Sequence, residues 1–231
     1  MAVRLKPMLD NLGTCLVIVA ACALLWRLAP QSQVSPTVNP IEDVTDLSLQ
    51  AGEVRHVLGT GEVALLEFGD FQCPYCATHA TSTGPALHEE FVKSGKIQMI
   101  FVNYPLAIHQ YARKAGEAAE CAEKQGRFWE MYHWLFKHQA ELDETSLVRH
   151  AEELGLNRPK FVSCLQTGET AINITADLKT ARRLGVSSTP LFFLGRRAAG
   201  GDIRLLKRIK GTAPLATFRT AIAEVSGEAS K

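Results

Sequence analysis

The tetrapeptide Cys73-Pro74-Tyr75-Cys76 lies between an apolar run, 63–68, and a stretch whose composition permits a helix. A thiol at the start of a helix feels the partial positive charge of the unpaired backbone N–H groups, which favours the thiolate. The thiolate is the form that attacks a disulfide, and the second cysteine follows closely enough to resolve the mixed disulfide. The order strand, CxxC, helix therefore predicts a dithiol/disulfide couple.

The composition permits a large folded body. The chain has 231 residues, of which 46% are hydrophobic, so it can bury a core without help from disulfides. The formal net charge is +1, so the charge balance gives no reason to expect nucleic acid as a partner. A monomer without a cofactor is expected.

The first residues, 1–29, are predicted to be a signal-anchor or transmembrane segment. Arg4 and Lys6 precede a mostly apolar stretch, 12–26, and Arg27 follows it. This stretch is long for a signal-peptide core and short for a spanning helix. Because sites for cleavage are poor, an uncleaved anchor with its N-terminus inside is favoured over a cleaved export signal, and both over a buried helix of a cytosolic domain. Both export interpretations put the remaining chain where disulfides persist.

The polar, proline-spotted segment 30–52 is predicted to be a linker, and 53–227 a single α/β domain. Gly84-Pro85 is expected to kink the first helix of this domain. A helical block is predicted over about 106–184. The basic residues of the last strand are expected to protect a free sheet edge. Strands are predicted at 54–58, 63–68, 97–102, 191–194 and 203–209, and a last helix at 214–225.

Two motifs, together with the order of elements, carry a family resemblance. CPYC follows Glu-Phe-Gly-Asp-Phe-Gln, and Gly-Val-Ser-Ser-Thr-Pro-Leu-Phe-Phe comes more than a hundred residues later, with Thr189-Pro190 directly before a core strand. This pattern resembles the thioredoxin superfamily, and the helical block makes the chain similar to the DsbA-like thiol:disulfide oxidoreductases. The resemblance covers about 54–225 and implies a thioredoxin fold with a helical insertion between its two halves.

The resemblance implies roles for particular residues. Cys73 is then the exposed nucleophile that carries the mixed disulfide, and Cys76 is the more buried resolving thiol. Pro190 is then a cis-proline that faces the sulfurs and frees the backbone of Thr189 to pair with an extended substrate. Pro74 and Tyr75, between the cysteines, are expected to contact the substrate.

Glu67 lies inside the apolar strand before the motif, where DsbA itself carries an acidic residue. Burial raises the pKa of a carboxyl group, so a buried Glu67 is expected to exchange the proton of Cys76. The alternative is a glutamate on the solvent side of the strand.

Tyr75 departs from the Pro-His pair of the archetypal DsbA, and CPYC also occurs in glutaredoxins and in periplasmic isomerases. The resemblance therefore implies the type of reaction more firmly than its direction. An oxidase is the first hypothesis. A reductase or isomerase fed by a membrane electron donor is the second, and a redox-inert peptide-binding module is the third.

Cys121 and Cys164 remain in two predicted helices of the helical block. In an oxidising compartment two remaining cysteines usually pair, so a structural disulfide is expected; two buried free thiols, or a pair that regulates the active couple, are the alternatives. No metal site is expected, because no second ligand pair accompanies the CxxC motif. His79, His88 and His109 are expected to be ordinary surface histidines. The aromatic set Phe128, Trp129, Tyr132, Trp134 and Phe136 is expected to form the core of the helical block.

The sequence thus favours an oxidoreductase that exchanges disulfides with the cysteines of exported proteins. It is expected to be anchored in the membrane with its domain on the periplasmic side, or to be exported. A membrane redox partner, either a quinone-linked reoxidase or an electron donor, is expected to recycle the pair.

Overall fold

The apolar run before the cysteine pair forms the central strand of the sheet. In this computed structural model, which describes residues 40–228, β4 (Val63–Gly69) is parallel to β5 (Ile97–Asn103) and antiparallel to β6 (Leu191–Arg197). Every residue of β4 and of β5 is buried. A strand with helices on both faces has no solvent side, which explains its continuous apolar character.

The other strands complete the two sides of the sheet. The strand order is β1-β7-β6-β4-β5-β3, and β2 also pairs with β7. All pairings except that of β4 with β5 are antiparallel. The remaining strands are β1 (Glu42–Asp43), β2 (Ser48–Leu49), β3 (Val57–Leu58) and β7 (Ile203–Lys210).

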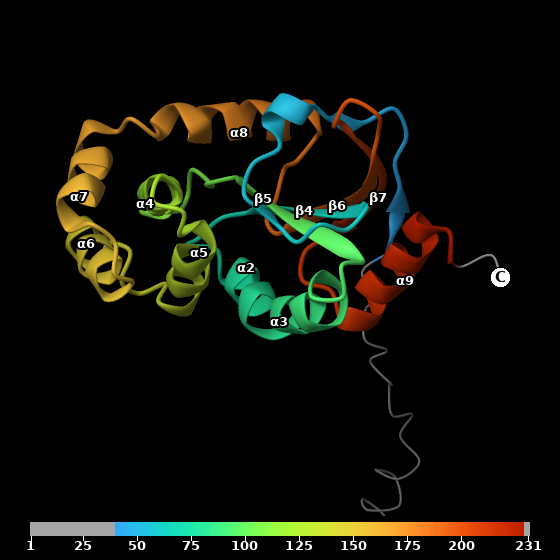
Figure 1. Cartoon of the computed structure of the whole chain (residues 1–231), viewed down its shortest axis with the longest axis horizontal. Coiled ribbons are helices and arrows are strands. Elements are labelled where there is room, and N and C mark those ends of the chain that lie inside the picture. Colours follow the sequence, from blue (N-terminus) through green and yellow to red (C-terminus); the bar gives the residue numbers. More distant parts are fainter. Residues whose placement is uncertain (1–39, 229–231) are drawn as a thin grey trace, which may run out of the picture. The chain divides into compact units, whose positions relative to one another are not determined.

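Helices cover both faces of this sheet (Figure 1). On one face, Leu65 and Phe192 pack with the long helix that follows the cysteines and with α9 (Leu215–Ser226). On the other face, Leu66 and Phe193 pack with residues of α8 (Ala171–Arg183). Neighbouring residues of a strand point to opposite faces, so one strand supplies both cores.

The helix after the cysteines continues through Gly84-Pro85, so the predicted kink takes a different form. Two π-helical turns flank the proline, and the N–H of Gly84 bonds to the carbonyl of His79. The wider π turn removes the clash that a proline ring makes in an α-helix. The consecutive segments are α2 (Pro74–Thr78), η2 (His79–Thr83), α3 (Gly84–Leu87) and η3 (His88–Val92).

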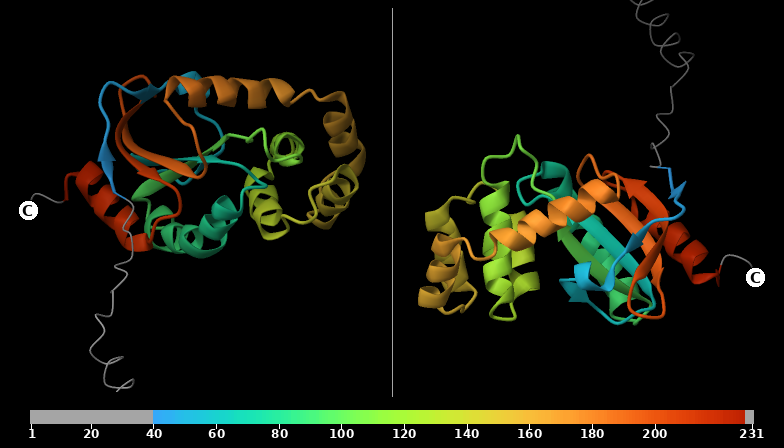
Figure 2. Two further views of the ribbon diagram at one scale, coloured as in Figure 1. Left: turned by 180° about the vertical axis from the view of Figure 1, so that it is seen from behind. Right: turned by 90° about the horizontal axis from the view of Figure 1, so that it is seen from above.

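The predicted helical block is present between β5 and β6, and it gathers on the side of the sheet away from α9 (Figure 2). Its core contains Phe128, Tyr132 and Phe136, three members of the aromatic set. A disulfide joins Cys121 of α4 to Cys164 of α7. The helices before α8 are α4 (Ala112–Glu123), α5 (Phe128–Lys137), α6 (Glu144–Glu153) and α7 (Arg158–Thr167).

The linker prediction is wrong for residues 42–49, because this segment belongs to the sheet. β1 and β2 pair with β7, and Leu49 is completely buried. The basic residues of β7 therefore do not line a free edge: Lys207 lies 2.7 Å from Asp43, and Arg208 pairs with Glu42. Opposite charges across strands favour this pairing.

The predicted membrane segment, 1–29, and the first part of the predicted linker lie outside the described residues. Within 40–228, no helix is long and apolar enough to cross a membrane.

Candidate functional site

Cys73 lies where the start of α2 meets the Thr189–Pro190 segment, which is distant in the sequence. It is the N-cap residue of α2, with Pro74 in the first turn, and its N–H bonds to the carbonyl of Asp70 at 3.0 Å. Its thiol lies 3.6 Å from the carbonyl oxygen of Thr189. The Thr189–Pro190 peptide bond is cis. The fold therefore brings the two sequence motifs together, and the Thr189–Pro190 loop faces the cysteine pair.

The two thiols have opposite environments. A hydrogen bond from the Cys76 thiol, together with the nearby Thr189 side chain and with backbone N–H groups, lowers the pKa of Cys73 to about 5, although burial opposes this. Burial, the hydrogen bond with Cys73 and the nearby charge of Glu67 raise the pKa of Cys76 far above its ordinary value. At neutral pH the reduced pair therefore holds a thiolate at Cys73 and a thiol at Cys76.

Cys73 is less exposed than the sequence predicted. Its exposed fraction is only 3%, because loops on both sides enclose it. It still lines an open groove of about 490 Å³, in which the exposed Pro74 and Tyr75 lie beside it. One wall is the segment 106–109 after β5, and the other is 187–189 before Pro190. The groove thus opens to solvent beside the cysteine turn.

Glu67 is buried, with an exposed fraction of 2%, so it does not lie on a solvated face. Its Oε2 atom accepts a hydrogen bond of 2.8 Å from the hydroxyl of Tyr132, and its Oε1 atom has no partner within residues 40–228. Burial raises the pKa of Glu67 to about 8, although the Tyr132 hydrogen bond opposes this. An acid with such a pKa can gain and lose a proton near neutral pH.

Tyr132 and His109 are site residues that the sequence analysis did not assign to the site. Tyr132 does lie in the core of the helical block, as predicted, but its hydroxyl reaches Glu67 on β4. His109 was expected to be an ordinary surface histidine, but it lines the groove. His79 is also not a surface residue, because it is buried against Phe192 and Phe218. No local pattern marks these contacts, since every partner is distant in the sequence.

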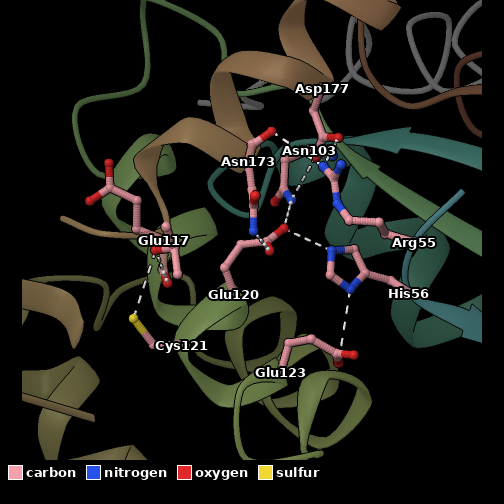
Figure 3. Close-up of polar contacts among 10 residues, drawn as sticks. Arg55, His56, Asn103, Glu117, Glu120, Cys121, Glu123, Asn173 and Asp177 are labelled. Carbon is pink, nitrogen blue, oxygen red and sulfur yellow. Dashed lines mark hydrogen bonds and ion pairs between the residues drawn. The ribbon is translucent and has the colours of Figure 1, made fainter. Parts of the chain in front are cut away.

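A buried polar network ties the helical block to the sheet (Figure 3). Glu120 of α4 accepts hydrogen bonds from the buried end of β5 and from α8, and it lies 2.7 Å from the His56 Nε2 atom. Burial alone would raise the pKa of Glu120, but the hydrogen bond with His56 brings it below the ordinary value. The side-chain partners of Glu120 are His56, Asn103 and Asn173.

Asp177 extends this network on α8. It accepts two hydrogen bonds of 3.1 Å from Asn103, and it forms an ion pair with Arg55. Burial raises the pKa of Asp177 to about 6, against the attraction of Arg55. These contacts fix α4 and α8 to the end of β5, where the wall of the groove begins.

Comparisons with known proteins agree with this fold. The Thioredoxin family (Thioredoxin_4) matches residues 53–206. Solved structures that are similar over most of the chain include alpha-DsbA1 of Wolbachia pipientis, with a TM-score of 0.65 and 24% identity; the match covers 75% of this chain and 91% of that one. They also include oxidised BdbD from Bacillus subtilis, with a TM-score of 0.63 and 20% identity; this match covers 79% of this chain and 98% of that one.

The curated relatives include much longer proteins. The chain is 36% identical over 208 residues to Na(+)/H(+) antiporter NhaA 3 of Salinispora tropica, a match that covers 84% of this chain and 31% of the relative. The chain thus spans about a third of the length of the curated relatives it matches first.

The fold and the paired cysteines define a thioredoxin-fold protein with a helical insertion. The chain belongs to the thioredoxin family and has the DsbA-like form of its fold.

Proposed function

We propose that this chain is a thiol:disulfide oxidoreductase that oxidises cysteines of exported proteins through the Cys73–Cys76 couple. The observation that carries the proposal is the difference between the two thiols: the pKa of Cys73 is lowered to about 5, and that of Cys76 is raised. A stable thiolate at Cys73 favours the reduced form of the pair. Such a pair is a strong oxidant, because it gains stability when it takes electrons.

The reaction proceeds in two exchanges. A substrate thiolate attacks Cys73 of the oxidised pair, the Cys73–Cys76 bond breaks, and a mixed disulfide forms at Cys73. The second substrate thiolate then attacks the substrate sulfur of that bond, and Cys73 leaves as a thiolate. The substrate gains a disulfide, and the pair gains the two electrons.

Glu67 supplies a proton in this scheme. The leaving Cys76 sulfur is buried, which disfavours its charge, so it takes a proton from the neutral Glu67 carboxyl group, and Glu67 becomes the carboxylate. The Glu67 pKa of about 8 suits this role near neutral pH. The thiol at Cys76 then completes the hydrogen bond that stabilises the Cys73 thiolate.

The groove holds the substrate. Pro74, Tyr75 and Thr189 line it next to Cys73, so an extended peptide can lie against them. The cis bond before Pro190 leaves the Thr189 carbonyl facing the sulfur, and proline has no N–H group with which to close that position.

The proposal includes the setting of the reaction. We infer that residues 1–29 anchor the chain or direct its export, with the redox domain in the periplasm, and that a quinone-linked membrane protein reoxidises the pair. The apolar stretch 12–26 supports export. A monomer without a bound cofactor suffices for this chemistry.

The antiporter relatives favour a second candidate function. In those proteins, the part similar to this chain belongs to a polypeptide about three times as long, whose name denotes a membrane transporter. In this second candidate function, the cysteines on which this chain acts belong to a membrane protein. The remaining alternatives are a reductase or isomerase fed by a membrane electron donor, and a redox-inert peptide-binding module.

Two experiments separate these possibilities. The equilibrium of the pair with glutathione gives its reduction potential: a value of about −120 mV supports the oxidase, and a value of about −270 mV favours the reductase.

A Cys76→Ser variant should accumulate mixed disulfides at Cys73 in cells, and the proteins trapped in them distinguish exported substrates from membrane proteins. A Cys73→Ser variant, the matched control, should trap none. If Cys73→Ser retains full function, the redox proposal is wrong.

A further inference from the structure

The buried carboxylate of Asp70 builds one wall of the groove. Its Oδ2 atom accepts a hydrogen bond of 2.8 Å from the Leu106 N–H, and the same atom lies 2.8 Å from His109 Nδ1. Its Oδ1 atom accepts a hydrogen bond of 2.7 Å from the Gln72 N–H. The exposed fraction of Asp70 is 1%. One side chain thus fixes both the turn before Cys73 and the segment 106–109.

This arrangement orients the imidazole ring of His109. A carboxylate only accepts hydrogen bonds, so Nδ1 carries the proton that faces Asp70, and Nε2 is the basic atom. Nε2 lies on the opposite edge of the ring from Asp70, and no group within residues 40–228 forms a hydrogen bond with it. The side chain is 17% exposed and lines the groove together with Cys73.

Few other charged groups share the groove. Asp70 contacts the ring from the turn after β4, and Cys73 and Tyr75 are the titratable residues on the α2 side. The opposite wall, 187–189, consists of two serines and a threonine and carries no charge. Among the described residues that line the groove, His109 is the one histidine, so it is the imidazole that this groove offers to a substrate.

We propose that His109, held by Asp70, accepts the proton of the substrate thiol that attacks Cys73. This inference rests on the proposed function, because it assigns a role in the oxidation of a dithiol. Asp70 is the positioning residue, and its charge stabilises the imidazolium ion that forms.

Protons and electrons balance in the first exchange. The substrate S–H bond breaks, its proton moves to Nε2 of His109, and the sulfur electron pair forms the bond to the Cys73 sulfur. The Cys73–Cys76 bond breaks, and its electron pair leaves with Cys76, which is protonated by Glu67. The imidazolium ion then lies in the same groove as Cys73, where its charge favours departure of the Cys73 thiolate in the second exchange.

The test measures the rate at which the full oxidised chain oxidises dithiothreitol, between about pH 5 and pH 8. The ionisation of the dithiothreitol thiols affects the wild-type and the His109→Gln rates equally, so it cancels in the ratio of the two rates. We expect this ratio to rise from near one in acid to about tenfold or more at neutral pH, because only the neutral imidazole accepts a proton. Free imidazole should restore part of the lost rate in His109→Ala.

The control is His88→Ala, which removes a partly exposed histidine that lies outside the groove; it should keep the wild-type rate with or without imidazole. A rate ratio that is constant with pH, or His109→Ala without rescue, would show that His109 only shapes the wall and would overturn the inference. A wild-type chain that oxidises the dithiol no faster than His109→Gln overturns this inference alone. A wild-type chain that does not oxidise it at all overturns the proposed function, and this inference with it.

Discussion

Tyr132 donates its hydroxyl hydrogen to Glu67 across a 2.8 Å contact between the helical block and the central strand. The two residues are 65 positions apart in the chain. Glu67 in turn raises the pKa of Cys76 by its charge. The helical block therefore acts on the pKa of Cys76 through a buried carboxyl group.

Replacing Tyr132 by Phe should raise the pKa of Glu67 above its present value of about 8, because the carboxylate loses the donor that stabilises its charge. A hydrogen bond to a charged group contributes about 1.5 kcal/mol or more, so the rise should be about one pH unit. Carbon-13 NMR of the labelled carboxyl group measures it. Tyr104→Phe removes a hydroxyl that bonds to Val186 and should leave the Glu67 titration unchanged. An unchanged titration in Tyr132→Phe would contradict the contact.

Replacing Glu67 by Gln should stabilise the fold in alkaline solution. The pKa of Glu67 is raised to about 8 by burial, so the folded state disfavours its charge. The stability that the neutral form contributes is complete below the unfolded pKa of 4.5 and is lost as the pH rises to about 8. At about pH 8.5 the free energy of unfolding of the variant should thus exceed that of the wild type by on the order of a few kcal/mol. At about pH 4 the two should differ little.

Guanidinium denaturation at both pH values measures this difference in the free energy of unfolding. The exposed Glu62, which pairs with Arg196, provides the control through Glu62→Gln. If the gain of Glu67→Gln were equal in acid and in alkaline solution, the buried charge would not be its cause.

Replacing His79 by Leu should stabilise the fold in acid. Burial lowers the pKa of His79 to about 3, and both ring nitrogens lack a partner within residues 40–228. The unfolded chain binds a proton at this histidine below about pH 6.5, and the folded chain does not, so stability falls as the pH falls from there toward 3. The substitution should therefore change the free energy of unfolding more favourably at about pH 5 than at about pH 8, by about 2 kcal/mol. Thermal unfolding at the two pH values, with His88→Leu as the partly exposed control, measures this gain. An equal effect of His79→Leu at both pH values would refute the prediction.

Replacing Glu120 by Ala should destabilise the protein by about 3–5 kcal/mol, because it removes the partner of the buried His56 Nε2 atom and one acceptor each of Asn103 and Asn173. The control lies on the same helix: Glu123 is 47% exposed and lies 3.9 Å from the other nitrogen of His56. Glu123→Ala should cost about 1 kcal/mol or less. Urea denaturation compares the two variants. Equal losses would mean that the buried network is not the connection that holds α4 on the sheet.

The sequence predicted the parts of this molecule that local pattern or family motif defines. The long buried strands, the helical block and the pairing of CPYC with Thr189-Pro190 all follow from runs of residues that can be recognised along the chain. The burial of Glu67 was also predicted, because its apolar neighbours occupy both faces of a central strand.

The remaining features depend on partners that no local pattern reveals. β1 and β2 are two residues long each, too short to show alternation, and they form because β7 presents complementary charges and hydrogen bonds. A tyrosine in an apolar helix face indicates a core residue, but the sequence does not show which acid its hydroxyl meets. The same holds for His109, whose partner Asp70 is 39 positions away.

The disulfide between α4 and α7 has a consequence for the biogenesis of this protein. Each copy must lose two electrons at Cys121 and Cys164 before its helical block is covalently closed. A newly made chain therefore reaches its cross-linked form only where an oxidant accepts those two electrons.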